Sequence, residues 1–178
     1  DRWPWIHIPV GYFKTMGHPK MDWQYKTEPD PGLNGRSINW PRGKVLGGCS
    51  SVNGLLYVRG QKEDYEQWRQ LGNDGWGWDD VVNCFKRAES WEGGASELRG
   101  GSGPLSVSAT RLNHHAVDTY VQAALAAGYP YNEDYNGESQ EGMGYFQLTA
   151  QKGQRCSAAK AYITPIRNRE NLTILTGQ

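Results

Sequence analysis

The stretch from Arg42 to Gly60 combines residue types that suit close contact with a bound molecule. Gly47 and Gly48 follow an apolar pair, so the backbone can turn sharply there or approach another molecule. Residues 49–51 are small, and either serine among them could cap a helix. A glycine turn that opens a helix presents unpaired N–H groups and the positive end of the helix dipole, which suits a phosphate. A glycine turn into a buried helix that binds nothing fits these residues equally well.

Cysteines and histidines offer no clear catalytic or metal site. The cysteines are Cys49, Cys84 and Cys156. Their wide spacing and odd number argue against a disulfide framework and a Cys-x-x-Cys metal site, so we expect each to be a small buried residue. The histidines are His7, His18, His114 and His115. We expect solvated or hydrogen-bonding histidines and assign no catalytic and no metal-ligating residue.

The overall charge excludes some classes of partner. The 178 residues include 19 basic and 19 acidic side chains, mixed along the chain, so the formal net charge is zero. No basic stripe is present, which argues against nucleic-acid binding. No run approaches the roughly 20 apolar residues that cross a bilayer. The location stays unknown, with the cytoplasm favoured over secretion because no secretion signal is visible.

Residues 1–41 contain no clean periodic element, because six prolines interrupt them. We interpret this region as a long ordered excursion that packs through its aromatic side chains. Those aromatic anchors are Trp3, Trp5, Tyr12, Phe13, Trp23, Tyr25 and Trp40. A loop of this length in a compact fold is usually functional.

The elements beyond the glycine turn alternate between helix and strand. Apolar residues at helical spacing predict helices over residues 62–71 and 79–89. A third helix is capped by Asn113 and stopped by Gly128. Its expected apolar face comprises Val117, Tyr120, Val121, Ala124 and Leu125. Alternation predicts strands over residues 105–109 and 145–150, the latter with Phe146 and Leu148 on one face.

The last part of the chain predicts a short helix from Ser157 to Ile163, which Pro165 ends, and a final strand over residues 172–176. The whole pattern is a mixture of α and β. A strand at the very end would leave an unpaired sheet edge. The start is equally abrupt, so we expect a portion of a longer chain.

The stretch Pro41–Gly60 resembles the first signature of the glucose–methanol–choline family of flavin oxidoreductases. The resemblance continues in order along almost the whole chain. The matching segments are Asp22–Glu28, Asp64–Trp68, Gly75–Trp78, Phe85–Glu89, Gly103–Leu105, Gly142–Gln147 and Gly153–Ala158. It implies an α/β fold, with part of a Rossmann-like FAD-binding domain and part of a substrate-binding domain. The implied boundaries are 1–75 for the FAD-binding region with its cofactor lid, 76–151 for the substrate-facing region, and 152–178 for the segment in which the chain returns into the FAD-binding domain.

The resemblance also assigns the flavin contacts. Residues 45–50 would run along FAD through their main chain, and residues 53–56 would lie against the isoalloxazine ring. The implied cofactor-binding residues are Val45, Leu46, Gly47, Gly48, Cys49, Ser50, Asn53, Gly54, Leu55 and Leu56. Val52 stands where some relatives carry a histidine that attaches the flavin covalently, so we expect noncovalent binding. Arg42 and Lys44 could offset phosphate charge or be solvated surface cations.

Two parts of the family's machinery are missing from these residues. A dinucleotide normally binds at a Gly-x-Gly-x-x-Gly turn between a strand and a helix, and no such turn is found. In the family that unit lies immediately upstream, and the catalytic base lies near the carboxyl end. We therefore expect this chain alone to be inactive.

The resulting hypothesis is a portion of an FAD-dependent alcohol oxidoreductase. The intact protein would transfer a hydride from a primary or secondary alcohol to flavin and pass the electrons to oxygen or another acceptor. Two alternatives are an aromatic-rich carbohydrate-binding module and a catalytically inactive scaffold of the same family. The sequence does not decide which alcohol is used, nor between oxidase, dehydrogenase and lyase chemistry.

Overall fold

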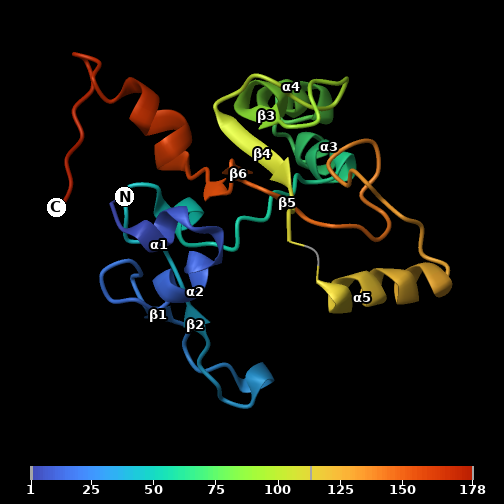
Figure 1. The fold of residues 1–178 in the computed structure, drawn as a ribbon, viewed down its shortest axis with the longest axis horizontal. Helices are drawn as coiled ribbons and strands as arrows, with labels where there is room; N and C mark the ends of the chain where they lie inside the picture. Colours follow the sequence, from blue (N-terminus) through green and yellow to red (C-terminus); the bar gives the residue numbers. More distant parts are fainter. Residues whose placement is uncertain (1, 113, 178) are drawn as a thin grey trace. The chain divides into compact units, whose positions relative to one another are not determined.

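The computed structural model describes residues 2–112 and 114–177, and its mixture of helices and strands confirms the α/β class (Figure 1). The chain forms two compact units. The first contains residues 1–55 and 150–178, and the second contains residues 56–149. The functional domain boundaries expected from the sequence stay predictions. Within the described residues, no helix is long and apolar enough to cross a membrane.

The first unit begins with short elements that the prolines delimit. Helix α1 (Pro4–His7), the 3-10 turn η1 (Pro9–Gly11) and helix α2 (Tyr12–Thr15) follow one another. Proline stands at the first position of α1 and of η1, where its missing N–H is not needed. Strands β1 (Tyr25–Lys26) and β2 (Asn39–Trp40) pair antiparallel, with the 3-10 turn η2 (Pro31–Leu33) between them.

The aromatic residues of this region make contacts through their rings, as expected, but most of them lie at the surface and not in the core. Phe13, Trp23, Tyr25 and Trp40 are exposed. They contact one another and nearby cations instead: Trp23 stacks on Tyr25 with an interplanar angle of 2°. The buried side chains here are smaller, namely Ile6, Thr15 and Asp22.

The first unit is completed by a hairpin formed from strands β6 (Ala150–Gln151) and β7 (Gln154–Arg155). Its two-residue turn has positive φ at both Lys152 and Gly153, as a tight hairpin turn requires. The hairpin turns the buried side chain of Arg155 into the unit.

A π-helix, η4 (Ala159–Ile163), and a 3-10 turn, η5 (Thr164–Ile166), follow the hairpin. The short helix expected before Pro165 is therefore present in a widened form. The strand expected over residues 172–176 is wrong, because this segment pairs with no strand among the described residues and Leu175 is exposed. Apolar alternation does not make a strand without a hydrogen-bonded neighbour.

The second unit starts with two helices, α3 (Lys62–Gln70) and α4 (Trp78–Ala88), close to the expected ranges. The Gln61 N–H donates to the Asp64 carboxylate at 2.9 Å and so caps α3. Tyr65 of α3 packs edge-on against Phe85 of α4, and Trp78 lies beside Tyr65. Trp78 thus anchors the turn between the two helices.

A three-stranded sheet lies next in the chain, in the order β3-β4-β5. Strand β3 (Glu89–Trp91) is parallel to β4 (Leu105–Ala109), and β4 is antiparallel to β5 (Gln147–Leu148). Gly103 precedes β4 where a Cβ atom would come within 2.3 Å of the Ala88 carbonyl carbon, so only glycine fits this close approach.

The predicted face of the strand at residues 145–150 is inverted. Gln147 is buried, whereas Phe146 is exposed. The reason is polar: Gln147 Oε1 accepts from Arg99 and Asn136, and its Nε2 donates to Asp134. A buried hydrogen-bond network therefore takes the position that hydrophobic alternation assigns to an apolar side chain.

Helix α5 (His115–Ala126) ends at Gly128, as expected, where φ is +94°. The cap predicted at Asn113 lies outside the described residues. His114 Nδ1 accepts from the Ala116 N–H at 3.2 Å and caps the helix. The predicted apolar face is only partly buried, because Val121 is inside while Val117 and Tyr120 are exposed.

Candidate functional site

The glycine turn at Gly47–Gly48 opens a single turn of 3-10 helix, η3 (Gly48–Ser51). The buried α-helix that these residues suggested is absent from this part of the described chain, so the helix-dipole argument for a phosphate has no support here. Gly48 has φ +56°, which explains one of the two glycines. After η3 the chain runs without regular structure through Asn53 to Leu55.

The ten residues predicted to contact a cofactor come from two runs, 45–50 and 53–56, and differ in exposure. Gly47 and Leu55 are buried; Val45, Gly48 and Ser50 are half-buried; Leu46, Cys49, Asn53, Gly54 and Leu56 are exposed. Nine of them belong to the first unit, and Leu56 is the first residue of the second. None of these contacts is tested by the structure, so they stay predictions.

The turn from Asn53 to Leu55 is strained and internally tied. Leu55 has φ +66°, a left-handed conformation that costs a non-glycine residue about 1–2 kcal/mol. Its side chain is buried, and its N–H donates to Asn53 Oδ1 at 3.1 Å. Strained residues of this kind persist where the surroundings determine the conformation, and they concentrate at binding sites.

Gly54 has no reason within the chain to be glycine. Its φ lies outside the left-handed region, and an added Cβ would meet no atom within 4 Å. Every other glycine with described surroundings either has positive φ or would place its Cβ against other atoms. Glycine at an exposed position with an ordinary backbone fits close approach of a group from outside the chain. The open space beside Gly54 therefore leaves room for a cofactor at this turn.

The turn is held from behind by two polar side chains. Ser50 Oγ accepts from the Ala158 N–H at 2.8 Å. Arg155 donates to the Ser50 carbonyl at 3.0 Å and to the Asn53 carbonyl at 2.8 Å. The sequence included Arg155 only within a matching segment and gave it no role. Its approach to Asn53 joins residues 102 positions apart, which no local pattern indicates.

The cysteine prediction is correct only for Cys156, because Cys49 and Cys84 are exposed. All three are free thiols. No group of three or more metal-ligating side chains gathers among the described residues. His18 Nδ1 accepts from the Lys20 N–H at 3.2 Å, so it has the hydrogen-bonding role expected of it.

Arg42 and Lys44 are exposed beside aromatic rings. The Arg42 guanidinium lies 5.0 Å from the Trp40 ring centroid, and Lys44 Nζ lies 4.6 Å from that of Trp23. Such cation–π contacts occupy both side chains at the surface.

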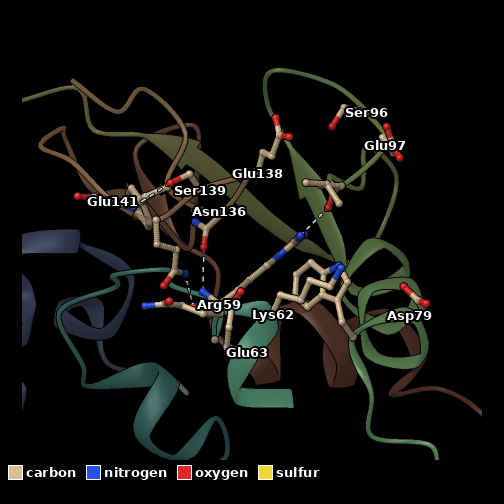
Figure 2. Close-up of a pocket in the computed structure, with 17 residues that line it drawn as sticks. Arg59, Lys62, Glu63, Asp79, Ser96, Glu97, Asn136, Glu138, Ser139 and Glu141 are labelled. Carbon is tan, nitrogen blue, oxygen red and sulfur yellow. Dashed lines mark hydrogen bonds between the residues drawn. The ribbon is translucent and has the colours of Figure 1, made fainter. Parts of the chain in front are cut away.

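The second unit contains a polar cavity of about 1100 Å³ (Figure 2). Its acidic lining residues are Glu63, Asp79, Glu97, Glu138 and Glu141. Arg59 lies at its floor, where its N–H donates to Asn136 Oδ1 at 2.8 Å and its guanidinium also binds Glu89. Because these buried groups are paired within the protein, the cavity does not by itself indicate a ligand.

The family model described as GMC oxidoreductase matches residues 11–178. The chain belongs to this family. The mitochondrial choline dehydrogenase of Mus musculus is 44% identical over 94% of this chain, and the oxygen-dependent choline dehydrogenase of Brucella anthropi is 42% identical over 99%. The chain spans 28% and 32% of the lengths of these two relatives.

Solved structures of an oxidase and of an FAD-dependent oxidoreductase share this fold. Pyridoxine 4-oxidase from Mesorbium loti superposes with a TM-score of 0.92 at 30% identity, over 98% of this chain and 35% of the other. An FAD-dependent oxidoreductase from Chaetomium thermophilum gives a TM-score of 0.87 at 26% identity, over 98% of this chain and 32% of the other. The family predicted from the sequence is thereby confirmed.

Proposed function

We propose that this chain is the cofactor-contacting portion of an FAD-dependent oxidoreductase that removes a hydride from an alcohol. Family membership supports this function. The structural observation behind it is Gly54, because its exposed backbone leaves room for a cofactor. The similar proteins include dehydrogenases and oxidases that are named for their alcohol substrates, choline and pyridoxine. Bound FAD supplies the hydride acceptor.

The chain's own residues bind and orient in this proposal. The exposed main chain around Gly54 lies against the cofactor, and the Asn53 amide offers it a hydrogen bond. Leu55, buried and strained, fixes the direction in which the turn points. None of these side chains moves a proton, so the catalytic base is supplied from outside this set. A small alcohol is the proposed substrate, and oxygen or another oxidant is the proposed electron acceptor.

The substitution Gly54→Ala tests the proposal. Because its Cβ meets no atom of the chain, the free energy of unfolding of the FAD-free protein should be unchanged or up to about 1 kcal/mol higher. The dissociation constant for FAD should rise at least about tenfold, since the added methyl group occupies the space of the cofactor. The measurement is FAD titration of the deflavinated protein, as its gene encodes it, beside thermal unfolding.

Gly128→Ala is the matched control. Gly128 ends α5 with φ +94° and open surroundings, so alanine there should cost about 1 kcal/mol of stability and leave FAD affinity unchanged. Unaltered FAD binding by Gly54→Ala, or a wild-type protein that binds no flavin, would overturn the proposed function.

The carbohydrate-binding alternative has one observation in its favour, the exposed Trp23, Tyr25 and Trp40. Two of these rings are in contact with Lys44 and Arg42. Titration with soluble oligosaccharides, followed by tryptophan fluorescence, separates the two functions. Saturable sugar binding without flavin binding would favour the alternative.

A further inference from the structure

Arg155 is a buried cation that pairs with no carboxylate among residues 2–112 and 114–177. Its side chain is 1% exposed. Nε donates to the Ile6 carbonyl at 2.9 Å, Nη1 donates to the Ser50 carbonyl at 3.0 Å, and Nη2 donates to the Asn53 carbonyl at 2.8 Å. Nη1 also donates to Asn53 Oδ1 at 2.8 Å. All four acceptors are neutral oxygens.

Burying a cation without a carboxylate partner costs the folded state free energy. Burial lowers the pKa of Arg155 to about 10, because the protein interior disfavours the charged form. The buried arginines of the second unit differ: Arg59 and Arg99 both bind the Glu89 carboxylate. Three of the four bonds from Arg155 end on the segment from Ser50 to Asn53. The residue is therefore arranged to hold that segment, and not to neutralise a charge.

The contact determines which way the Asn53 amide faces. A guanidinium and a backbone N–H have only hydrogen-bond donors, so the amide atom that meets both Arg155 and the Leu55 N–H must be the oxygen. The NH2 group is the other branch of the planar amide, so it points in a different direction from the oxygen. Asn53 is exposed, its oxygen is bound to Arg155 and Leu55, and its NH2 group makes no hydrogen bond to the described residues, so this donor is available to a ligand.

We propose that Arg155 is a positioning residue that holds the Asn53 amide as an outward hydrogen-bond donor for an acceptor atom of the flavin. The proposal rests on the proposed function, since it takes the cofactor to lie at this turn. It also predicts specificity. The site presents a hydrogen-bond donor at Asn53, so it favours a ligand with an acceptor atom at that point. An amide free to rotate would present either end.

A purely structural role for Arg155 makes a different prediction. If Arg155 only stabilised the fold, every substitution at Asn53 or Arg155 would change stability and FAD affinity in the same direction. If Arg155 positions the Asn53 amide, stability and FAD affinity can change in different directions. Asn53→Asp keeps an oxygen facing Arg155 and gives the cation a carboxylate partner, so the melting temperature should stay equal or rise. The outward NH2 becomes an oxygen, so FAD should bind at least about tenfold more weakly.

The experiment uses the protein as its gene encodes it, deflavinated and titrated with FAD. The variants are Asn53→Asp, Asn53→Ala, Arg155→Met and the double variant Asn53→Ala/Arg155→Met. Asn53→Ala should weaken FAD binding about tenfold in the presence of Arg155, and less than about twofold when Arg155 is already Met. The flavin visible spectrum of each variant reports whether the environment of the bound ring has changed.

Lys160→Met is the matched control for charge. Lys160 is a cation of the same unit whose Nζ donates to Gln154 at 3.2 Å. Its removal should change the FAD dissociation constant by less than about twofold. An effect of Lys160→Met as large as that of Arg155→Met would replace the positioning role with general electrostatics and overturn the proposal.

The outcomes distinguish the two proposals. A wild-type protein that binds no FAD refutes the proposed function. If wild type binds FAD, equal effects of Asn53→Ala in both backgrounds, or wild-type affinity in Asn53→Asp, refute the positioning role alone. If Arg155→Met does not fold, Arg155→Lys replaces it in the double-variant comparison, because lysine keeps the cation but lacks the fork of donors that holds the amide. The proposal then requires weaker FAD binding together with an undiminished melting temperature in Asn53→Asp.

Discussion

Asp22 organises the start of the first unit through hydrogen bonds to the main chain. Its Oδ1 accepts from the Gln24 N–H at 2.9 Å and the Arg42 N–H at 3.0 Å, and Oδ2 accepts from the Gly17 N–H at 2.7 Å. Burial on its own raises the pKa of this carboxyl, but the three N–H donors outweigh it and hold the pKa below its ordinary value. The ionised form is therefore the one that stabilises the fold.

Asp22→Asn should lower the free energy of unfolding by about 1–3 kcal/mol at neutral pH, because an amide nitrogen would meet an N–H donor. A lowered pKa in the folded state gives stabilisation that is complete above the unfolded-state pKa, about 3.9, and is lost as the pH falls through the folded-state value. Denaturant unfolding at pH 7, 5 and 3 should thus show the difference between wild type and variant shrinking toward pH 3.

The control is Asp30→Asn, an exposed carboxylate with one backbone bond, from the Gly32 N–H at 2.7 Å. It should cost about 1 kcal/mol or less. A wild-type advantage over Asp22→Asn that stays constant between pH 7 and pH 3 would contradict the assignment.

Glu89 joins the elements of the second unit at the point where α4 passes directly into β3. Its carboxylate is fully buried and binds Arg59 and Arg99, and it also accepts from the Gly100 N–H at 3.0 Å. Asp134 is a further partner of Arg99. Two buried cations and two carboxylates thus form the polar centre of the unit.

Glu89→Gln should lower the free energy of unfolding by about 3–5 kcal/mol, because two buried guanidinium groups would lose their shared counterion. Thermal or urea unfolding measures this. Arg111→Met provides the comparison: it breaks the Arg111–Glu92 pair, in which the arginine side chain is 78% exposed, and should cost under about 1 kcal/mol. Similar losses from both variants would show that Glu89 is not at the centre of the network.

The helices of the second unit were predictable because their signals are local. Spacing and end residues gave α3 and α4 to within about one residue at most ends. The strand at residues 172–176 and the face of Gln147 were predicted wrongly, because pairing and polar burial depend on distant partners. The exposure of most aromatic side chains in residues 1–41 was likewise beyond the sequence, because composition does not tell which surface covers them.

At the scale of the whole molecule, the family model matches residues 11–178, and the 178 residues contain no Gly-x-Gly-x-x-Gly turn. The 178-residue chain by itself should therefore retain no FAD through gel filtration and should oxidise no alcohol, because the pyrophosphate lacks its usual backbone cradle. Absorbance of the purified chain after incubation with excess FAD checks this. A yellow protein peak whose flavin is reduced by an alcohol would contradict the prediction.

The sequence by itself determined the family and the α/β class, and it singled out the segment around Gly47–Gly54 for the predicted cofactor contacts, because each depends on residue types at fixed short spacing. Only the tertiary structure decided what supports that segment. Arg155 reaches Asn53 across 102 positions because the β6–β7 hairpin turns a buried cation toward neutral oxygens. Gly54 likewise became informative only once its empty surroundings were known. Local propensity follows from neighbouring residues, whereas burial and hydrogen-bond partners depend on where the chain returns.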